Sequence, residues 1–251
     1  MSVIELKNPG YLDVSCEGGV VSVGCDQMWY PKDGFIPRGA CGAAAASNLL
    51  MYLLRSKSCS FASENLSKEG EADYDKNVKN EAARYRDLLN EDEFNKTDEL
   101  IDVISTGAGP IPKEKCLEFM KKVYPFFVPP IGGLLSDDFL EGIRGFSKKY
   151  VLPFKAERLI VTISRAVRPP YSELAGFISK ALKNDSPVAF LILSSGSERA
   201  LDTWHWVTIL AFDEGGGKAK ITDNGKVFWA DIGKWHATSI MGGALVSAFT
   251  Y

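Results

Sequence analysis

The spacing of hydrophobic residues changes along the chain. In the first 185 residues, apolar positions recur at helical spacing in several segments, while later ones form short runs rich in β-branched and aromatic residues. The stretch 41–55 is rich in Ala, Leu and Met and is apolar on most faces, so we expect a buried helix. The pattern predicts helices over 41–55, 113–127, 136–150 and 171–184.

Beyond residue 186 the sequence predicts short strands joined by tight turns. The runs lie at 188–193, 204–212, 219–222, 226–229 and 244–249. Gly215–Gly217 separates the second run from the third, and Asn224-Gly225, a strong hairpin signal, separates the third from the fourth. We therefore predict an α+β fold with an antiparallel sheet. One domain over 1–251 is expected, with a mainly helical subdomain over about 1–185 and a β subdomain over about 186–251.

Two further segments have weaker patterns. Residues 18–23 read as a strand or hairpin arm. Residues 56–100 are charged throughout, with weak helical patterning at 78–89. A segment of this composition is expected to run over the surface.

Composition narrows the classes of partner. The 251 residues carry a formal net charge of -3, with 45% hydrophobic and 24% charged residues, as in ordinary globular proteins. Nothing indicates binding to nucleic acid or to an anionic membrane. No run reaches the roughly 20 apolar residues of a membrane span. The first residues lack the pattern of a signal peptide, so we expect a cytoplasmic protein.

Cysteine and histidine counts direct attention to thiol chemistry. The chain has five cysteines, an odd number without a CxxC pair, and only two histidines. This is a poor disulfide framework and a poor source of zinc ligands. We expect neither a metal site nor a cofactor.

Cys41 is the candidate nucleophile. It lies where a turn meets the predicted helix, and unpaired N–H groups at a helix start stabilise a thiolate. Gly39 and Gly42 would let a substrate approach the backbone closely, and the same N–H groups could face a developing oxyanion. The alternative is that Cys41 is a small packing residue in a tight helix.

His205 is the candidate base, and Asp223 or Asn224 the candidate group that orients it. His205 begins a strand that is apolar on both faces, which would hold an imidazole firmly. In an antiparallel pair, the end of the next strand returns to the start of the first, so Asp223 or Asn224 could reach the ring. Trp204 and Trp206, on either side of His205, could line a substrate cleft or pack in the core.

Two other residues were weighed for the site. Gln27, the single glutamine of the chain, could add a side-chain amide to an oxyanion hole, although a surface role is the simpler explanation. His236 is a second possible base, but it lies in a polar connection and has no acid at hairpin spacing. His205 is therefore preferred.

Three blocks together resemble the catalytic segments of papain-like cysteine peptidases. They are residues 41–48 (CGAAAASN), 205–210 (HWVTIL) and 221–225 (ITDNG), in the order Cys, His, Asp/Asn. The blocks look most like compact bacterial forms, such as bacteriocin-leader-processing and streptopain-like peptidases. The resemblance implies a papain-like fold and hydrolysis of a peptide or amide bond, with Gln27 in a segment similar to the upstream glutamine motif of streptopain-like enzymes.

Two alternatives remain at this stage. Phe35 stands where papain-like enzymes usually place the oxyanion glutamine, which would suit a non-catalytic papain-like binding module. The same catalytic groups could also serve an acyl or peptidyl transferase. The substrate and the oligomeric state are not predicted.

Overall fold

The fold is given by a computed structural model that describes most of the chain. The described residues are 2–19, 21–30, 40–64, 100, 103–104, 109–128 and 133–250, without the side chains of residues 57–64 and 250. Of the predicted surface excursion at 56–100, residues 56–64 are instead helical, and residues 65–99, including the weak pattern at 78–89, lie outside these ranges.

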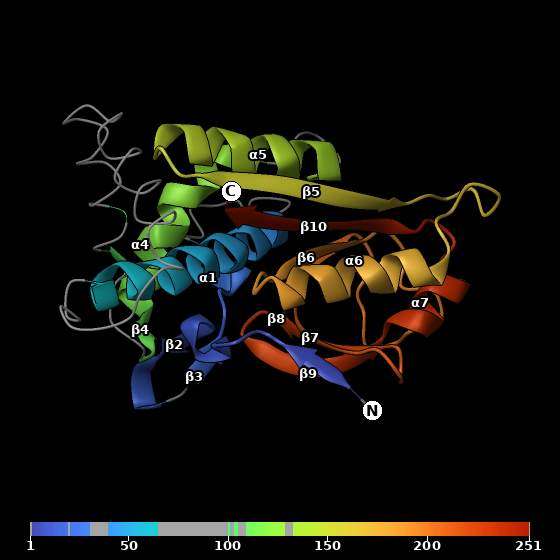
Figure 1. Ribbon diagram of the computed structural model, residues 1–251, viewed down its shortest axis with the longest axis horizontal. Coiled ribbons are helices and arrows are strands. Elements are labelled where there is room, and N and C mark those ends of the chain that lie inside the picture. The colour runs from blue at the N-terminus through green and yellow to red at the C-terminus, as the bar shows by residue number, and fades with distance from the viewer. Residues whose placement is uncertain are drawn as a thin grey trace, which may run out of the picture.

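A large antiparallel sheet forms the body of the molecule (Figure 1). Its strands follow the order β5-β10-β6-β7-β8-β9, and β1 also pairs with β7. Every pairing in it is antiparallel. The bounds are β1 Val3–Glu5, β5 Phe154–Val161, β6 Val188–Ile192, β7 His205–Asp213, β8 Lys218–Asp223, β9 Lys226–Asp231 and β10 Gly243–Thr250.

Strand β7 lies inside this sheet. Its first half pairs with β6, its last residues pair with β1, and β8 runs along its other edge. Eight of its nine residues, beginning with His205, are buried. The start of β7, from His205 onward, is therefore fixed by its pairing with β6, and β8 joins the other edge from Thr208.

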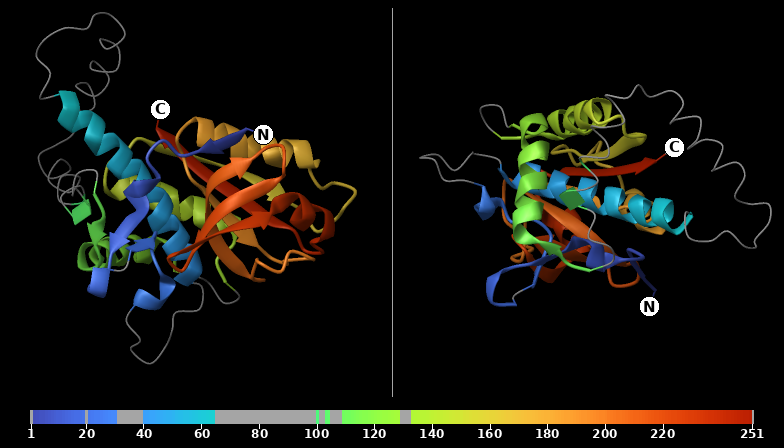
Figure 2. Two further views of the ribbon diagram at one scale, coloured as in Figure 1. Left: turned by 90° about the horizontal axis from the view of Figure 1, so that it is seen from below. Right: turned by 90° about the vertical axis from the view of Figure 1, so that its left-hand side faces the viewer.

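The helices pack around this sheet. Helix α1 crosses against β6, β7 and β10, while α5 covers β5 and α6 contacts β1 and β7. Helix α4 packs on α1 away from the large sheet (Figure 2). The bounds are α1 Ala40–Glu64, α4 Lys113–Val123, α5 Ser136–Lys149, α6 Tyr171–Lys183 and α7 Ile232–Thr238.

A small sheet and four 3-10 turns complete the described structure. In the small sheet, β2 pairs with β3 antiparallel and with β4 parallel. Its strands are β2 Asp13–Ser15, β3 Val21–Val23 and β4 Ile111–Pro112, and the turns are η1 Pro9–Leu12, η2 Glu17–Gly19, η3 Gln27–Trp29 and η4 Tyr124–Phe126. Within the described ranges, no helix has the length and apolar character needed to cross a membrane.

The predicted α+β class is confirmed, as are the four helices and five strands of the pattern. Helix α1 continues beyond the predicted end to Glu64. The predicted helix 113–127 ends at Val123 and continues as η4, because Pro125 lacks an N–H and disfavours a further α-helical turn. The predicted strand at 18–23 is shorter, since η2 precedes β3.

Strands β1, β2, β4 and β5 and helix α7 were not predicted. Strand β5 carries Lys155, Glu157 and Arg158, which obscure its apolar positions. Strand β1 has only three residues, and α7 is a short helix whose Asp231 side chain accepts a hydrogen bond from the Lys234 N–H. Strands β1 and β5 thus bring segments of the first 185 residues into the large sheet.

Truncating a side chain in the middle of this sheet should destabilise the fold. Val246 of β10 is fully buried between β5 and β6, so Val246→Ala should lower the free energy of unfolding by about 2 kcal/mol. The matched change Val227→Ala, at a position 38% exposed on β9, should cost less than about 1 kcal/mol. Urea denaturation of both variants measures the difference, and equal losses would contradict this description of the core.

Candidate active site

Cys41 is the second residue of α1, at the end of the helix where backbone N–H groups are unpaired. Its side chain is 9% exposed. At Gly42 a Cβ atom would lie 2.5 Å from Leu134 Cδ2 and 3.3 Å from Trp206 Cδ1. Gly42 therefore has a packing role, because it lets these side chains close around the start of the helix. Gly39 lies outside the described residues.

His205 begins β7 and is also 9% exposed. The next residue, Trp206, donates its indole N–H to the Leu134 carbonyl at 2.8 Å. Its ring stacks on Phe139 with centroids 4.3 Å apart. These contacts fix the start of β7, and with it the His205 side chain, against the segment leading into α5.

Asp223 ends β8 and returns to the start of β7. The register pairs Thr208 with Thr222, and the turn that follows Asp223 has Asn224 at φ 47° and Gly225 at φ 75°, conformations that Asn and Gly tolerate. The Asp223 Oδ1 atom lies 2.8 Å from His205 Nε2. Of the two residues predicted as partners, the structure joins Asp223 to His205, while Asn224 forms the turn.

The protonation of His205 reflects these contacts. Burial by itself lowers the pKa of His205, but the hydrogen bond to Asp223 and the interaction with Cys41, together with their charges, outweigh it and raise the pKa to about 10. The ring is therefore an imidazolium at neutral pH. It carries interactions with a carboxylate and with the Cys41 thiol at once.

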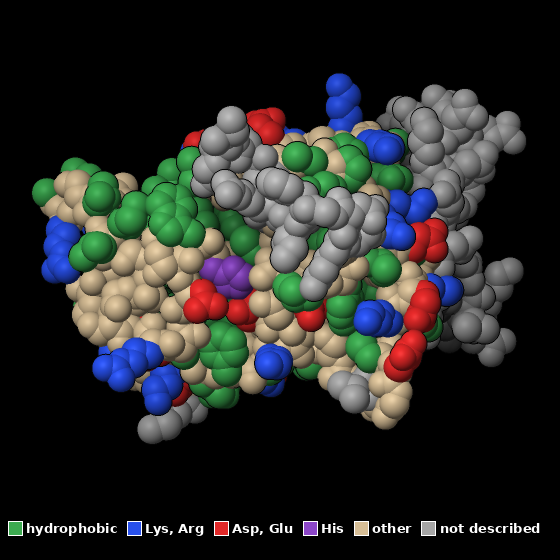
Figure 3. Space-filling model, turned by 180° about the vertical axis from the view of Figure 1, so that it is seen from behind, with side chains coloured by type: hydrophobic (Ala, Val, Ile, Leu, Met, Phe, Trp, Pro, Cys, Tyr) green, Lys and Arg blue, Asp and Glu red, His purple; other side chains and the backbone are tan. Residues whose placement is uncertain are grey.

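A small hollow lies between α1, β7 and β8. Its lining includes Cys41 and Asp223, together with Trp206, whereas His205 itself is not among the lining residues. The remaining lining residues are Cys25, Ala44, Ala45, Asn48, Val207, Thr208, Thr222 and Asn224. On the face shown in Figure 3, a histidine side chain reaches the surface with acidic side chains beside it and hydrophobic side chains nearby.

Gln27 lies in η3, a turn that packs against α1. The Asp26 side chain caps this turn by accepting from the Met28 N–H at 2.7 Å. Cys25, two residues before Gln27, lines the hollow, and its N–H donates to Asn48 Oδ1 at 2.6 Å. The turn is thus tied to α1, although no described residue hydrogen-bonds to the Gln27 amide.

Two other candidates lie apart from the hollow. Trp204, unlike Trp206, is absent from its lining and is 54% exposed. His236 lies in α7, where its Nε2 contacts the Pro169 carbonyl at 2.9 Å. This contact gives His236 a structural role, because it links α7 to the segment before α6.

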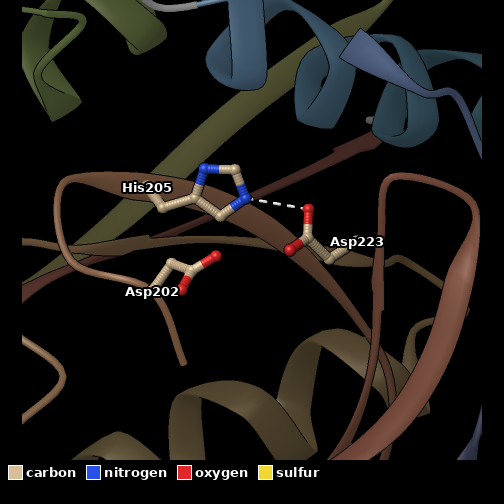
Figure 4. A group of neighbouring side chains, drawn as sticks. All are labelled: Asp202, His205 and Asp223. Atoms are coloured by element: carbon tan, nitrogen blue, oxygen red, sulfur yellow. Dashed lines mark hydrogen bonds and ion pairs between the residues drawn. The ribbon is translucent and has the colours of Figure 1, made fainter. Parts of the chain in front are cut away.

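The sequence pattern did not single out Asp202 or Asn48. Figure 4 shows the Asp202 and Asp223 carboxylates both turned toward the His205 ring. Potential ligand atoms of these three residues lie within 4.8 Å of one another, a spacing that a divalent cation could bridge. In the described structure His205 Nε2 is instead engaged with Asp223 Oδ1 at 2.8 Å.

Comparisons with known proteins do not assign this chain to a family. A scan against protein-family models finds no match, and a search of curated proteins finds none either. The chemistry of the site therefore has to be argued from its own geometry.

The Asp223 contact should control the titration of His205. Asp223→Asn removes the charged acceptor, so the pKa of His205 should fall below about 10, while Cys41 continues to oppose the effect of burial. NMR titration of the two imidazole rings measures this, with His236→Gln assigning the signals. An unchanged pKa in Asp223→Asn would contradict the role given to this bond.

The same shift predicts a pH dependence of stability. The pKa of His205 is higher in the folded protein than its ordinary value of 6.5, so protonation stabilises the fold. This contribution is complete below about pH 6.5 and is lost as the pH rises through about 10. Chemical denaturation across this range should show falling stability in the wild type and a flatter profile in Asp223→Asn.

Proposed function

We propose that the protein is a cysteine hydrolase that cleaves a peptide or amide bond through a thioester intermediate, in the manner of papain-like peptidases. One observation carries the proposal. The imidazole of His205 is hydrogen-bonded to Asp223 on one side and interacts with the Cys41 thiol at a helix start. A thiol, a base and a group that orients the base are the parts that nucleophilic catalysis by cysteine requires.

Catalysis begins from an ion pair. In the resting site the Cys41 proton already lies on the ring, so a thiolate stands beside an imidazolium whose Nε2–H is held by Asp223. The thiolate attacks the substrate carbonyl carbon. The resulting oxyanion would be stabilised by N–H groups at the start of α1, including that of Cys41, with the Gln27 amide as a second donor.

Collapse of the tetrahedral intermediate expels the amine. His205 gives its proton to the leaving nitrogen, and the acyl group remains on Cys41 as a thioester. His205 then removes a proton from water, which attacks the thioester, releases the acid and restores the ion pair. A non-water nucleophile in the second step would instead make the protein a transferase.

The thiol should be more reactive than its burial suggests. At about pH 6, where an ordinary thiol is almost fully protonated, iodoacetamide should alkylate Cys41 faster than Cys16, which is more exposed. Mass spectrometry of peptides from timed samples measures both rates within one protein. His205→Ala should abolish the faster alkylation of Cys41. Faster alkylation of Cys16 than of Cys41 in the wild type would contradict the proposal.

Cleavage of a pooled peptide library tests the reaction itself. The wild type should produce new peptide ends, and Cys41→Ala and His205→Ala should each reduce the rate by at least about a thousandfold. Asp223→Asn should retain more activity than either. Products formed with an added amine would separate a transferase from a hydrolase. Equal product formation by wild type and Cys41→Ala would refute the mechanism.

A further inference from the structure

Trp204, which directly precedes the proposed base, has an unusual backbone conformation. Its φ angle is 56°, in the left-handed region that side chains other than Asn and Asp rarely adopt. The other described non-glycine residues with positive φ are Val151, Asp185 and Asn224. A large aromatic residue in this region costs of order 1 kcal/mol or more.

The need for a tight turn does not explain a tryptophan at this position. The chain must turn sharply before β7, and glycine would take the same conformation without strain. Core packing does not explain it either, because the side chain is 54% exposed and does not line the hollow. Neither the strained backbone nor the exposed indole is thus explained by a contribution to the stability of the fold.

The backbone on both sides of Trp204 is anchored. The Thr203 hydroxyl oxygen lies 3.3 Å from both the backbone nitrogen and the hydroxyl of Ser195. On the other side, His205 is fixed by the pairing of β7 with β6, in which it lies opposite Ile192. The indole is therefore carried by an anchored backbone, one residue from the imidazole.

We propose that Trp204 is a specificity-determining residue whose indole binds a large apolar or aromatic side chain of the substrate next to the bond that is cleaved. This inference rests on the proposed function and adds a substrate class to it. An exposed indole offers a broad apolar surface at little cost in conformational entropy, and aromatic pairs gain further from stacking. Contact with a substrate would bury the surface that the free protein leaves in water.

Nearby charges further restrict which substrate side chains can bind. The Asp202 and Asp223 carboxylates both face His205, so an acidic substrate side chain at this position would meet like charge. The proposal therefore expects aromatic and large aliphatic side chains to be preferred and acidic ones to be excluded.

Cleavage profiles of the wild type and of Trp204 variants test the proposal. With a pooled peptide library read by mass spectrometry, the wild type should show a preference for aromatic or large aliphatic residues at one position near the cleaved bond. Trp204→Asn, which suits the backbone conformation but removes the ring, should reduce that preference at least about tenfold, mainly through KM. Trp204→Phe should retain most of it.

A second exposed tryptophan provides the matched control. Trp229 of β9 is 45% exposed, and Trp229→Asn should leave the cleavage profile unchanged. An unaltered profile in Trp204→Asn, or a wild-type preference for basic residues at that position, would overturn the proposal. A fall in thermal stability with Trp204→Gly would also count against it, because glycine should relieve strain there.

Binding to Cys41→Ala separates this inference from the proposed hydrolysis. Fluorescently labelled peptides that differ only in one Phe or Asp residue should bind this variant with different affinities, and adding Trp204→Asn should erase the difference. If the wild type cleaves no peptide but Cys41→Ala still selects Phe through Trp204, hydrolysis fails and the binding role stands. If the wild type cleaves peptides but shows no preference that depends on Trp204, hydrolysis stands and the binding role of Trp204 fails.

Discussion

The close approach of α1 to β7 is the constraint on which the candidate site depends, because it brings a thiol and an imidazole from distant parts of the chain into contact. The first turns of α1 are almost entirely Ala and Gly, and every residue from Ala40 to Leu54 is buried. Small side chains let a helix backbone come near a strand. At Gly42 even one added carbon would meet Leu134 and Trp206.

The buried hydrogen bond between His205 and Asp223 follows from this packing and carries a cost. Removing an imidazolium from water is unfavourable, and the opposing effects on the His205 pKa reflect this competition. The bond still raises the pKa because Asp223, at the end of β8, is held opposite the ring by the β7–β8 register. The Asp223 carboxylate, held in place by two paired strands, thus stabilises the imidazolium charge in place of water.

Sequence reasoning worked where the chemistry depends on local pattern. The burial of α1, the β7–β8 hairpin and the return of Asp223 to His205 follow from apolar spacing and from the Gly215–Gly217 turn, so the acid and the base could be paired from the sequence. Strand β5 could not be found in this way, because Lys155, Glu157 and Arg158 interrupt its apolar pattern and its place is set by pairing with β10. Asp202 was missed for a similar reason, since a loop carboxylate gives no signal until its orientation is known.

In the N-terminal segment, isolated hydrogen bonds join parts of the site that are distant in sequence. Asn48 accepts from the Cys25 N–H at 2.6 Å and donates to the Thr208 hydroxyl at 3.1 Å. Thr222 donates to the Val23 carbonyl, so residues before η3 are bonded to α1 and β8 without a continuous strand ladder.

Gly24 makes this arrangement possible. It has a φ of 85°, and a Cβ atom there would lie 2.7 Å from Asn48 Oδ1. The same bonds that keep the Cys25 backbone against α1 therefore also set how far Gln27, two residues later, can lie from the start of that helix. The position of Gln27, the residue proposed as a second oxyanion donor, thus depends on the buried Asn48, and no pattern of hydrophobic spacing encodes that dependence.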